Sequence, residues 1–291
     1  MALSKFLDPK NNYTFRRIFG TEKNKDILIH FLNDILGRTG EAKIEDVAFL
    51  SPIQDPEIAA KKESIVDVLC RDSTGVRFIC EVQVARTSGF EKRAQFYASK
   101  AYSSQAGVGD QYQNLKEVIF IAITDFILFS HKSAYKSDHV ILDKVTYEHD
   151  LKDFSFTFIE LPKFPKTKED QLENIVEKWC YFFKYASETS EKDLRKIVGS
   201  DVIIGKAYNE LVGYNWTKEE QAMYEWIKKN EDDNVSCLKQ KLNEGILIGH
   251  EKGKIEGKIE VAKNSLKAGV SIDVIAQITG LSLDEIQKLR N

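Results

Sequence analysis

The pattern that most restricts the fold is the stretch SIVDVLCRDSTGVRFICEVQ at residues 64–83. Two runs rich in β-branched and aromatic residues surround the turn signal DSTG, and such runs predict an antiparallel pair of strands. Because side chains of a strand alternate between two faces, one face of this hairpin is expected to be apolar throughout. The other face mixes apolar residues with two acids, Asp67 and Glu81, and with Gln83. Carboxylates on such a hairpin need either ion-pairing partners or a functional role.

Alternation assigns each residue to a face. The expected core face holds Val66, Val68, Cys70, Val76, Phe78, Cys80, Val82 and Val84, and the mixed face holds Ile65, Asp67, Leu69, Arg71, Arg77, Ile79, Glu81 and Gln83. A three-residue loop at 73–75 suits a turn that ends in a left-handed glycine. It would place Asp67 opposite Glu81, whereas a two-residue loop would place Asp67 opposite Cys80 and mix the two faces. We therefore expect the three-residue loop.

Directly opposed side chains have Cβ atoms about 5 Å apart, where like charges repel. Two carboxylates at this spacing can share a divalent cation, and Mg²⁺ binds through one or two carboxylates together with waters and phosphate oxygens. Gln83 would project beside them from the same face and could hold a water or a phosphate oxygen. In a purely structural alternative, Asp67 pairs with Arg71 or Arg77, or the acids lie at strand ends in solvent.

The rest of the chain predicts a mixed α/β protein. The segment NKDILIHFLNDILG at 24–37 places apolar residues on one helical face and ends at a glycine. Strands are expected at 44–50, 64–72, 76–84, from 117 onward, at 139–145 and at 154–161, with a helix at 90–105. After residue 163 the pattern becomes helical. We expect three parts: residues 1–163, residues 164–236 and residues 237–291.

Composition restricts the class of protein. The net charge of −3 gives no overall attraction to nucleic acid, although a local basic groove is compatible with it. No apolar run is long enough to span a bilayer and no secretory signal begins the chain, so we expect a cytoplasmic protein without membrane contact. The four cysteines, Cys70, Cys80, Cys180 and Cys237, are scattered. They are expected to be buried, reduced thiols rather than disulfides or zinc ligands.

At these residues the chain resembles the PD-(D/E)XK nuclease superfamily, and more closely its Rpn family of recombination-promoting nucleases, also described as transposases. The resemblance extends over essentially the whole chain. It includes DPKNNYTFRRIFG at 8–20, KKESIVDVLCRDSTGVRFICEVQ at 61–83, KRAQFYASKAYSSQAGVGDQY at 92–112 and EVIFIAITDF at 117–126. It implies a restriction-endonuclease-like core of a helix, three strands, a helix and a strand, followed by a helical C-terminal region.

The resemblance also implies roles for residues. Asp67 and Glu81 correspond to the metal-binding acids of the nuclease motif, and Gln83 stands where most of the superfamily has lysine. Rpn-like relatives characteristically carry glutamine there. A lysine would supply a positive charge to the attacking water or to the developing phosphate charge, whereas glutamine can only position groups or form hydrogen bonds.

Further residues could support this site. Glu63 either adds a metal ligand or faces solvent. Arg93, Tyr97 and Lys100 recur at helical spacing and could line the cleft and contact phosphate, although Tyr97 is equally suited to the core. Gln105 occupies a position typical of the family, and no role for it follows from the sequence.

The C-terminal part contains glycines 245, 249, 253 and 257, which would lie on one side of a helix, and the alternative is a flexible linker. Residues 271–290 predict two short helices, the second capped by Ser282 with Glu285 three residues later. We expect an interaction or oligomerisation module, with a DNA-binding helix-turn-helix as the alternative.

The expected function is that of a Mg²⁺-dependent endonuclease of double-stranded DNA, with Mn²⁺ as a substitute, in which Asp67 and Glu81 hold the ion and Gln83 orients a water. A homodimer formed through the C-terminal region would place two such sites on opposite strands. The alternative is a weakly active or inactive protein of the same fold that acts as a DNA-binding or assembly module.

Overall fold

The computed structural model describes residues 5–54, 64–107, 109–199 and 201–289. The chain divides into two compact units, Met1–Lys228 and Lys229–Asn291.

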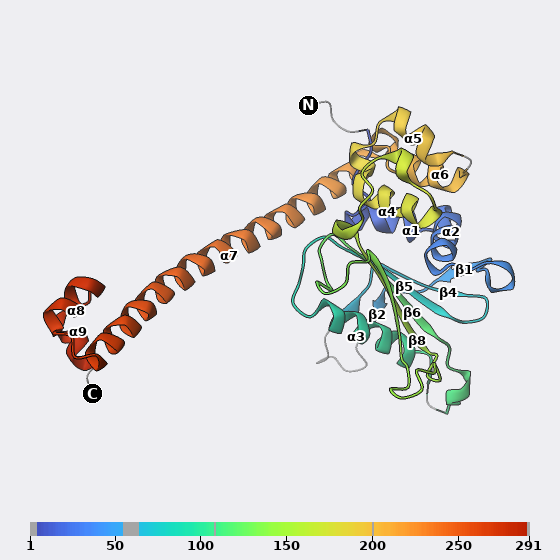
Figure 1. Ribbon diagram of the computed structural model, residues 1–291. Coiled ribbons are helices and arrows are strands. Elements are labelled where there is room, and N and C mark those ends of the chain that lie inside the picture. The colour runs from blue at the N-terminus through green and yellow to red at the C-terminus, as the bar shows by residue number, and fades with distance from the viewer. Residues whose placement is uncertain (1–4, 55–63, 108, 200, 290–291) are drawn as a thin grey trace. The chain divides into compact units, whose positions relative to one another are not determined.

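Six strands of the first unit form a mixed sheet in the order β1-β4-β5-β6-β8-β7 (Figure 1). Their bounds are β1 Val47–Phe49, β4 Val68–Asp72, β5 Arg77–Gln83, β6 Val118–Thr124, β7 Lys136–Val140 and β8 Phe154–Glu160. The pairs β5–β6 and β6–β8 are parallel, and the others are antiparallel. Every residue of β6 is buried, as expected for a parallel strand that is covered on both faces. Strands β2 Ile53–Gln54 and β3 Ser64–Ile65 form a separate pair.

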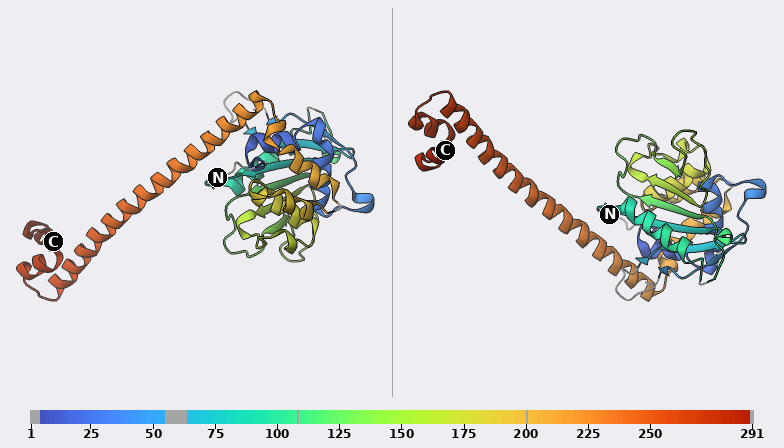
Figure 2. Two further views of the ribbon diagram at one scale, coloured as in Figure 1. Left: turned by 90° about the horizontal axis from the view of Figure 1, so that it is seen from above. Right: turned by 90° about the horizontal axis from the view of Figure 1, so that it is seen from below.

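Helices cover both faces of the main sheet. The core on one face contains residues of five helices: α1 Asn12–Phe19, α2 Lys25–Leu36, α4 Ile175–Tyr185, α5 Glu191–Val198 and α6 Val202–Glu210. Helix α3 Phe90–Ser103 packs against the other face through Phe90, Ala94, Ala98 and Ala101, and the right panel of Figure 2 shows it lying across the sheet. Short 3₁₀ helices lie at Glu22–Asn24, Gly40–Ala42, Tyr112–Asn114, Leu161–Lys163, Glu169–Gln171, Ala186–Glu188 and Gly213–Asn215.

The hairpin has the expected register. Its loop has three residues: the Asp72 N–H donates to the Val76 carbonyl oxygen at 3.0 Å, and Gly75 has a φ of +93°. Val68 pairs with Cys80 and Leu69 with Ile79, which is the register expected from the three-residue loop, and Asp67 lies one residue before the start of β4. The positive φ explains the glycine, since other residues rarely adopt it.

One face assignment in this hairpin is wrong. Val66 was expected to share the face of Val68 and Cys70, but it packs with Leu69 and Ile79 on the α3 side of the sheet. The cause is a break in the strand, because β3 ends at Ile65 and β4 begins at Val68. The Val66 N–H donates to the Pro52 carbonyl oxygen instead of continuing the ladder. Alternation of faces holds only within a continuous strand.

Other expectations differ in detail. Helix α1 was not expected, and the strand expected at 139–145 lies at Lys136–Val140. Cys70, Cys80 and Cys180 are buried, but Cys237 is exposed, which corrects the expectation for that residue. It lies on a mostly polar helix that continues past the first unit, where no core covers it.

The first unit extends across one of the expected boundaries. Phe164, Trp179 and Tyr208 belong to the same core cluster as strands β4 to β6 and β8, so the helices after residue 163 complete the packing of the sheet. The division into three parts at residues 163 and 236 stays a prediction.

The glycine segment of the second unit is helical. Helix α7 Lys218–Lys267 is continuous through all four glycines, so the linker alternative does not hold. It is followed by α8 Ile272–Thr279 and α9 Leu283–Lys288. Ala262, Ile275 and Ile286 form the buried centre of this unit. The expected capping box of Ser282 and Glu285 is present at the start of α9. Within the described ranges, none of the helices has both the length and the apolar character needed to cross a membrane.

Candidate active site

The two acids of the hairpin contact each other through the backbone. The Asp67 N–H donates to Glu81 Oε1 at 3.1 Å, and the Val82 N–H donates to Asp67 Oδ2 at 3.0 Å. Asp67 can form both of these hydrogen bonds because it lies just outside β4, between the end of β3 and the start of β4. Both residues are buried, with exposed fractions of 8% for Asp67 and 6% for Glu81. The fold thus brings the two predicted ligands together in a largely enclosed position.

This position makes negative charge unfavourable. Burial, together with the neighbouring charge of Asp67, raises the pKa of Glu81 to about 8. Burial also raises the pKa of Asp67, against the hydrogen bond from Val82 and the charge of Arg16. Desolvation penalises the ionised form of a carboxylate. Burial therefore favours the protonated form of the pair, and a bound cation would favour the ionised form.

Arg16 contacts the acid pair directly, although the sequence did not predict it as a residue of the site. Its Nε and Nη2 atoms both donate to Asp67 Oδ1, at 3.2 and 3.0 Å. It reaches Asp67 from α1, which begins after Asn11, whose side chain caps the first turn. The helix itself could have been predicted, since apolar Phe15, Ile18 and Phe19 recur at helical spacing.

Gln83 lies at the end of β5 and bonds to Arg93 of α3. Arg93 Nη2 donates to Gln83 Oε1, and Gln83 Nε2 donates to the Ala85 carbonyl oxygen at 3.0 Å. The Arg93 guanidinium also lies 4.9 Å from the centre of the Phe90 ring. The carbonyl oxygen and one N–H of the Gln83 amide are therefore both hydrogen-bonded, and the group that the carbonyl oxygen binds is the positively charged Arg93 guanidinium.

The remaining predicted residues are placed differently. Tyr97 is half-buried beside Arg93, and burial raises the pKa of its hydroxyl. Lys100 lies over the Phe96 ring at 5.7 Å. Gln105 exchanges two hydrogen bonds with the backbone of Lys116, just before β6. That is the opposite end of β5–β6 from Gln83, so Gln105 tethers the chain after α3. Glu63 lies outside the described residues.

The donor set fits a hard divalent cation. Carboxylate oxygens are the ligands preferred by Mg²⁺ and Mn²⁺, and Mg²⁺ commonly binds proteins through only one or two of them. Among the described residues, no cluster of three or more His, Cys, Asp or Glu side chains could hold a metal. Asp67 and Glu81 therefore suit an ion whose other ligands are waters and substrate oxygens.

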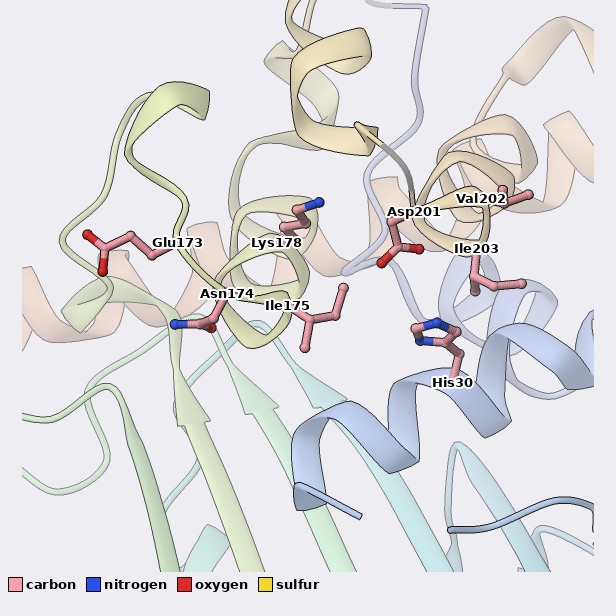
Figure 3. A pocket seen from close by; sticks show the side chains of 8 residues that line it. All are labelled: His30, Glu173, Asn174, Ile175, Lys178, Asp201, Val202 and Ile203. Atoms are coloured by element: carbon pink, nitrogen blue, oxygen red, sulfur yellow. The ribbon is translucent and has the colours of Figure 1, made fainter. Parts of the chain in front are cut away.

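A separate hollow of about 530 Å³ in the first unit is lined by residues of helices α2, α4 and α6 and of the segments before α4 and α6 (Figure 3). Its lining residues are His30, Glu173, Asn174, Ile175, Lys178, Asp201, Val202 and Ile203. The His30 imidazole points into it, and His30 Nδ1 lies 2.6 Å from Asp34 Oδ2. The lining carries charges of both signs and includes none of Asp67, Glu81 and Gln83. It is distinct from the carboxylate pair.

Two protein-family models match the chain. A family model described as PD-(D/E)XK nuclease family transposase matches residues 9–241. A second, described as Rpn/YhgA-like nuclease family, C-terminal HTH domain, matches residues 256–291. Neither the curated proteins nor the solved structures gave a match. The first match includes both acids and both arginines, and the second supports the helix-turn-helix alternative for α8 and α9.

Proposed function

Since the chain belongs to the PD-(D/E)XK nuclease family transposases, we propose that it is a Mg²⁺-dependent endonuclease that hydrolyses phosphodiester bonds of double-stranded DNA. The observation that carries this proposal is the buried pair Asp67 and Glu81, joined by a backbone hydrogen bond and flanked by arginines. A fold rarely encloses two carboxylates without a compensating partner. Mn²⁺ would substitute for Mg²⁺ because it prefers the same oxygen ligands.

The proposed mechanism divides the work among a few side chains. Asp67 and Glu81 would hold the ion, which when bound supplies Lewis acidity and lowers the pKa of a coordinated water. A water molecule would attack phosphorus and release one proton to solvent, one P–O bond to a sugar would break, and the departing sugar oxygen would take up a proton from solvent. The Val82 N–H keeps Asp67 oriented throughout, through its bond to Oδ2.

Gln83 has a more specific role in this proposal than that of orienting water. Its carbonyl oxygen holds Arg93, and one N–H is bonded to Ala85, which leaves a single N–H for water. We propose that Gln83 acts mainly by positioning Arg93, whose guanidinium would contact the DNA backbone. Tyr97 and Lys100 lie on the same helix, and any contact that they make with phosphate stays a prediction.

DNA binding by the second unit agrees with this function. The family model assigns residues 256–291 to an HTH domain, and such units place a helix in the major groove. We also infer a homodimer formed through the C-terminal region, because the glycines of α7 would let a second helix approach closely. A cytoplasmic location stays a prediction from the sequence.

Plasmid cleavage tests the proposal. Wild type, Asp67→Asn and Glu81→Gln would be compared in Mg²⁺, Mn²⁺ and EDTA, with Glu148→Gln as a control acid in the exposed loop after β7. We expect both site variants to lose about 10³-fold or more in rate, comparable to the loss of a group that stabilises the transition state. The control should cleave like wild type. Metal-dependent cleavage at the wild-type rate by either site variant would overturn the assignment.

The second candidate is a DNA-binding or assembly protein of the same fold with little or no activity. The glutamine in the lysine position favours it, because an amide carries no charge. In that case wild type would bind DNA equally well with or without metal, would not cleave it, and would tolerate Asp67→Asn.

A further inference from the structure

We propose that Arg16 is a catalytic residue that binds the phosphate at which cleavage occurs, a role that rests on the nuclease function proposed above. It would supply the positive charge that residue 83 lacks.

Asp67 holds one edge of the Arg16 guanidinium. Nε and Nη2 donate to the same oxygen, Asp67 Oδ1, so the plane of the group is fixed beside the acid pair. In the parts of the chain that the structure describes, no acceptor bonds to Nη1. The Arg16 side chain is 45% exposed, whereas that of Asp67 is 6% exposed. The remaining N–H groups can therefore bind an anion that reaches the acids from solvent.

The end of α1 is docked against the strand that follows Asp67. The Gly20 N–H donates to the Arg16 carbonyl oxygen at 2.8 Å. A Cβ atom at residue 20 would lie 2.8 Å from that oxygen and 3.4 Å from Val68 Cγ2. The first contact is with the last turn of α1 itself, so glycine is needed for the tight end of this helix, whereas the second is an ordinary van der Waals distance. Arg16 thus lies in the last turn of a helix whose end is next to Val68, the residue that follows Asp67.

Arg17, the next residue, serves a structural purpose. Its guanidinium lies 4.6 Å from the centre of the Trp216 ring, and it pairs with Glu220 and Glu210. Its side chain is 20% exposed. Those partners already satisfy its charge, so of the two arginines only Arg16 is directed at the acids.

The charge balance of the site gives Arg16 its role. Among the described contacts of Asp67 and Glu81, Arg16 is the cation within hydrogen-bond distance of a carboxylate, while Arg93 bonds to Gln83. Negative charge builds up on phosphate oxygens as water attacks, and a preoriented guanidinium stabilises it without giving up a proton. Arg16 would bind these oxygens through its outer N–H groups while Asp67 fixes its inner edge.

The test combines cleavage with DNA binding, using the full chain. The variants are Arg16→Ala and Arg16→Lys, with Arg195→Ala as a control for an exposed arginine on α5. We expect Arg16→Ala to lower kcat about 10²–10³-fold with a smaller change in KM, and Arg16→Lys to recover part of the loss. Binding to a short duplex would be measured over a range of salt concentrations with Ca²⁺ in place of Mg²⁺. The slope of log K against log salt should fall by about one in Arg16→Ala and stay unchanged in Arg195→Ala.

The two readouts separate failure of this inference from failure of the proposed function. An inactive wild type would overturn the nuclease function, and the salt slope would still decide whether Arg16 contacts phosphate. An unchanged slope in Arg16→Ala, with lower thermal stability alone, would show that Arg16 only neutralises Asp67 and would overturn the inference.

Discussion

Asp67 and Glu81 lie where ionisation is costly, and this cost has a consequence for stability. The pKa of Glu81 is about 8 in the folded chain, because of burial and the nearby Asp67, against an ordinary value of 4.5. Between these values the folded state binds a proton that the unfolded state does not. The free energy of unfolding therefore falls as pH rises through this window.

The Glu81→Gln variant tests this cost. In the presence of a chelator, the free energy of unfolding of wild type should fall between about pH 5 and pH 8. Residue 81 cannot ionise in Glu81→Gln, so the free energy of unfolding of this variant should fall by about 1–3 kcal/mol less over the same range. Denaturant midpoints at several pH values give the comparison. Parallel pH profiles for the two proteins would show that Glu81 is not held in its neutral form.

The difference between Arg16 and Arg17 shows what the sequence could not reveal at this scale. The hairpin register follows from its own turn, so Asp67 and Glu81 could be paired from local residues. Which of two adjacent arginines faces that pair depends on how the apolar face of α1 packs on the sheet. Docking involves residues distant in the chain, and no local pattern encodes it.

Among the helices, strands and turns, the predictions were correct where a single sequence pattern continued without a break. Helices α2 and α3, the hairpin turn and the cap of α9 each follow from periodicity or turn chemistry. The break between β3 and β4 moved Val66 to the opposite face because alternation was assumed to continue. The same break frees the Asp67 backbone to bond Glu81, so the local departure from the strand rule occurs at the candidate site.

The glycine stripe of α7 gives a prediction for this helix. A methyl group added at Gly249 or Gly253 would meet no heavy atom within 4 Å in the single chain. The double variant Gly249→Ala/Gly253→Ala should therefore favour the helix by about 0.5–1 kcal/mol at each position. If a second copy packs against the stripe, the same methyl groups should separate the dimer.

Light scattering together with circular dichroism would distinguish these effects. We expect wild type to have the mass of a dimer and the double variant to have the mass of a monomer with equal or greater helix content. Lys252→Ala is a control on the same stretch of helix and should remain dimeric. A double variant with the mass of wild type would rule out the stripe as the contact.

At the scale of the whole molecule, the two units have separate cores. Among its described residues, the second unit has a small buried centre of Ala262, Ile275 and Ile286 with partly buried apolar residues around it, whereas the sheet unit buries many large side chains. All three tryptophans, Trp179, Trp216 and Trp226, belong to the first unit, so their fluorescence reports on that unit only. The stability of one unit can thus be changed and monitored independently.

Ile286→Ala should unfold the second unit selectively. Truncating a buried isoleucine costs about 2–5 kcal/mol, which a core of this size cannot absorb. We expect DNA affinity to fall at least about tenfold, while the unfolding transition seen by tryptophan fluorescence stays the same. Ile278→Ala, at a 65% exposed position of α8, is the matched control for stability. Unchanged DNA affinity in Ile286→Ala would mean that the helix-turn-helix does not contribute to DNA binding.

The central claim is that Asp67 and Glu81 bind one divalent cation together. A crystal structure of the full chain soaked in Mn²⁺, with anomalous diffraction measured at the manganese edge, tests it most directly. We expect one strong anomalous peak with carboxylate oxygens of both residues at bonding distance. A peak bound by other residues, or no peak at the pair in crystals that take up Mn²⁺ elsewhere, would contradict it.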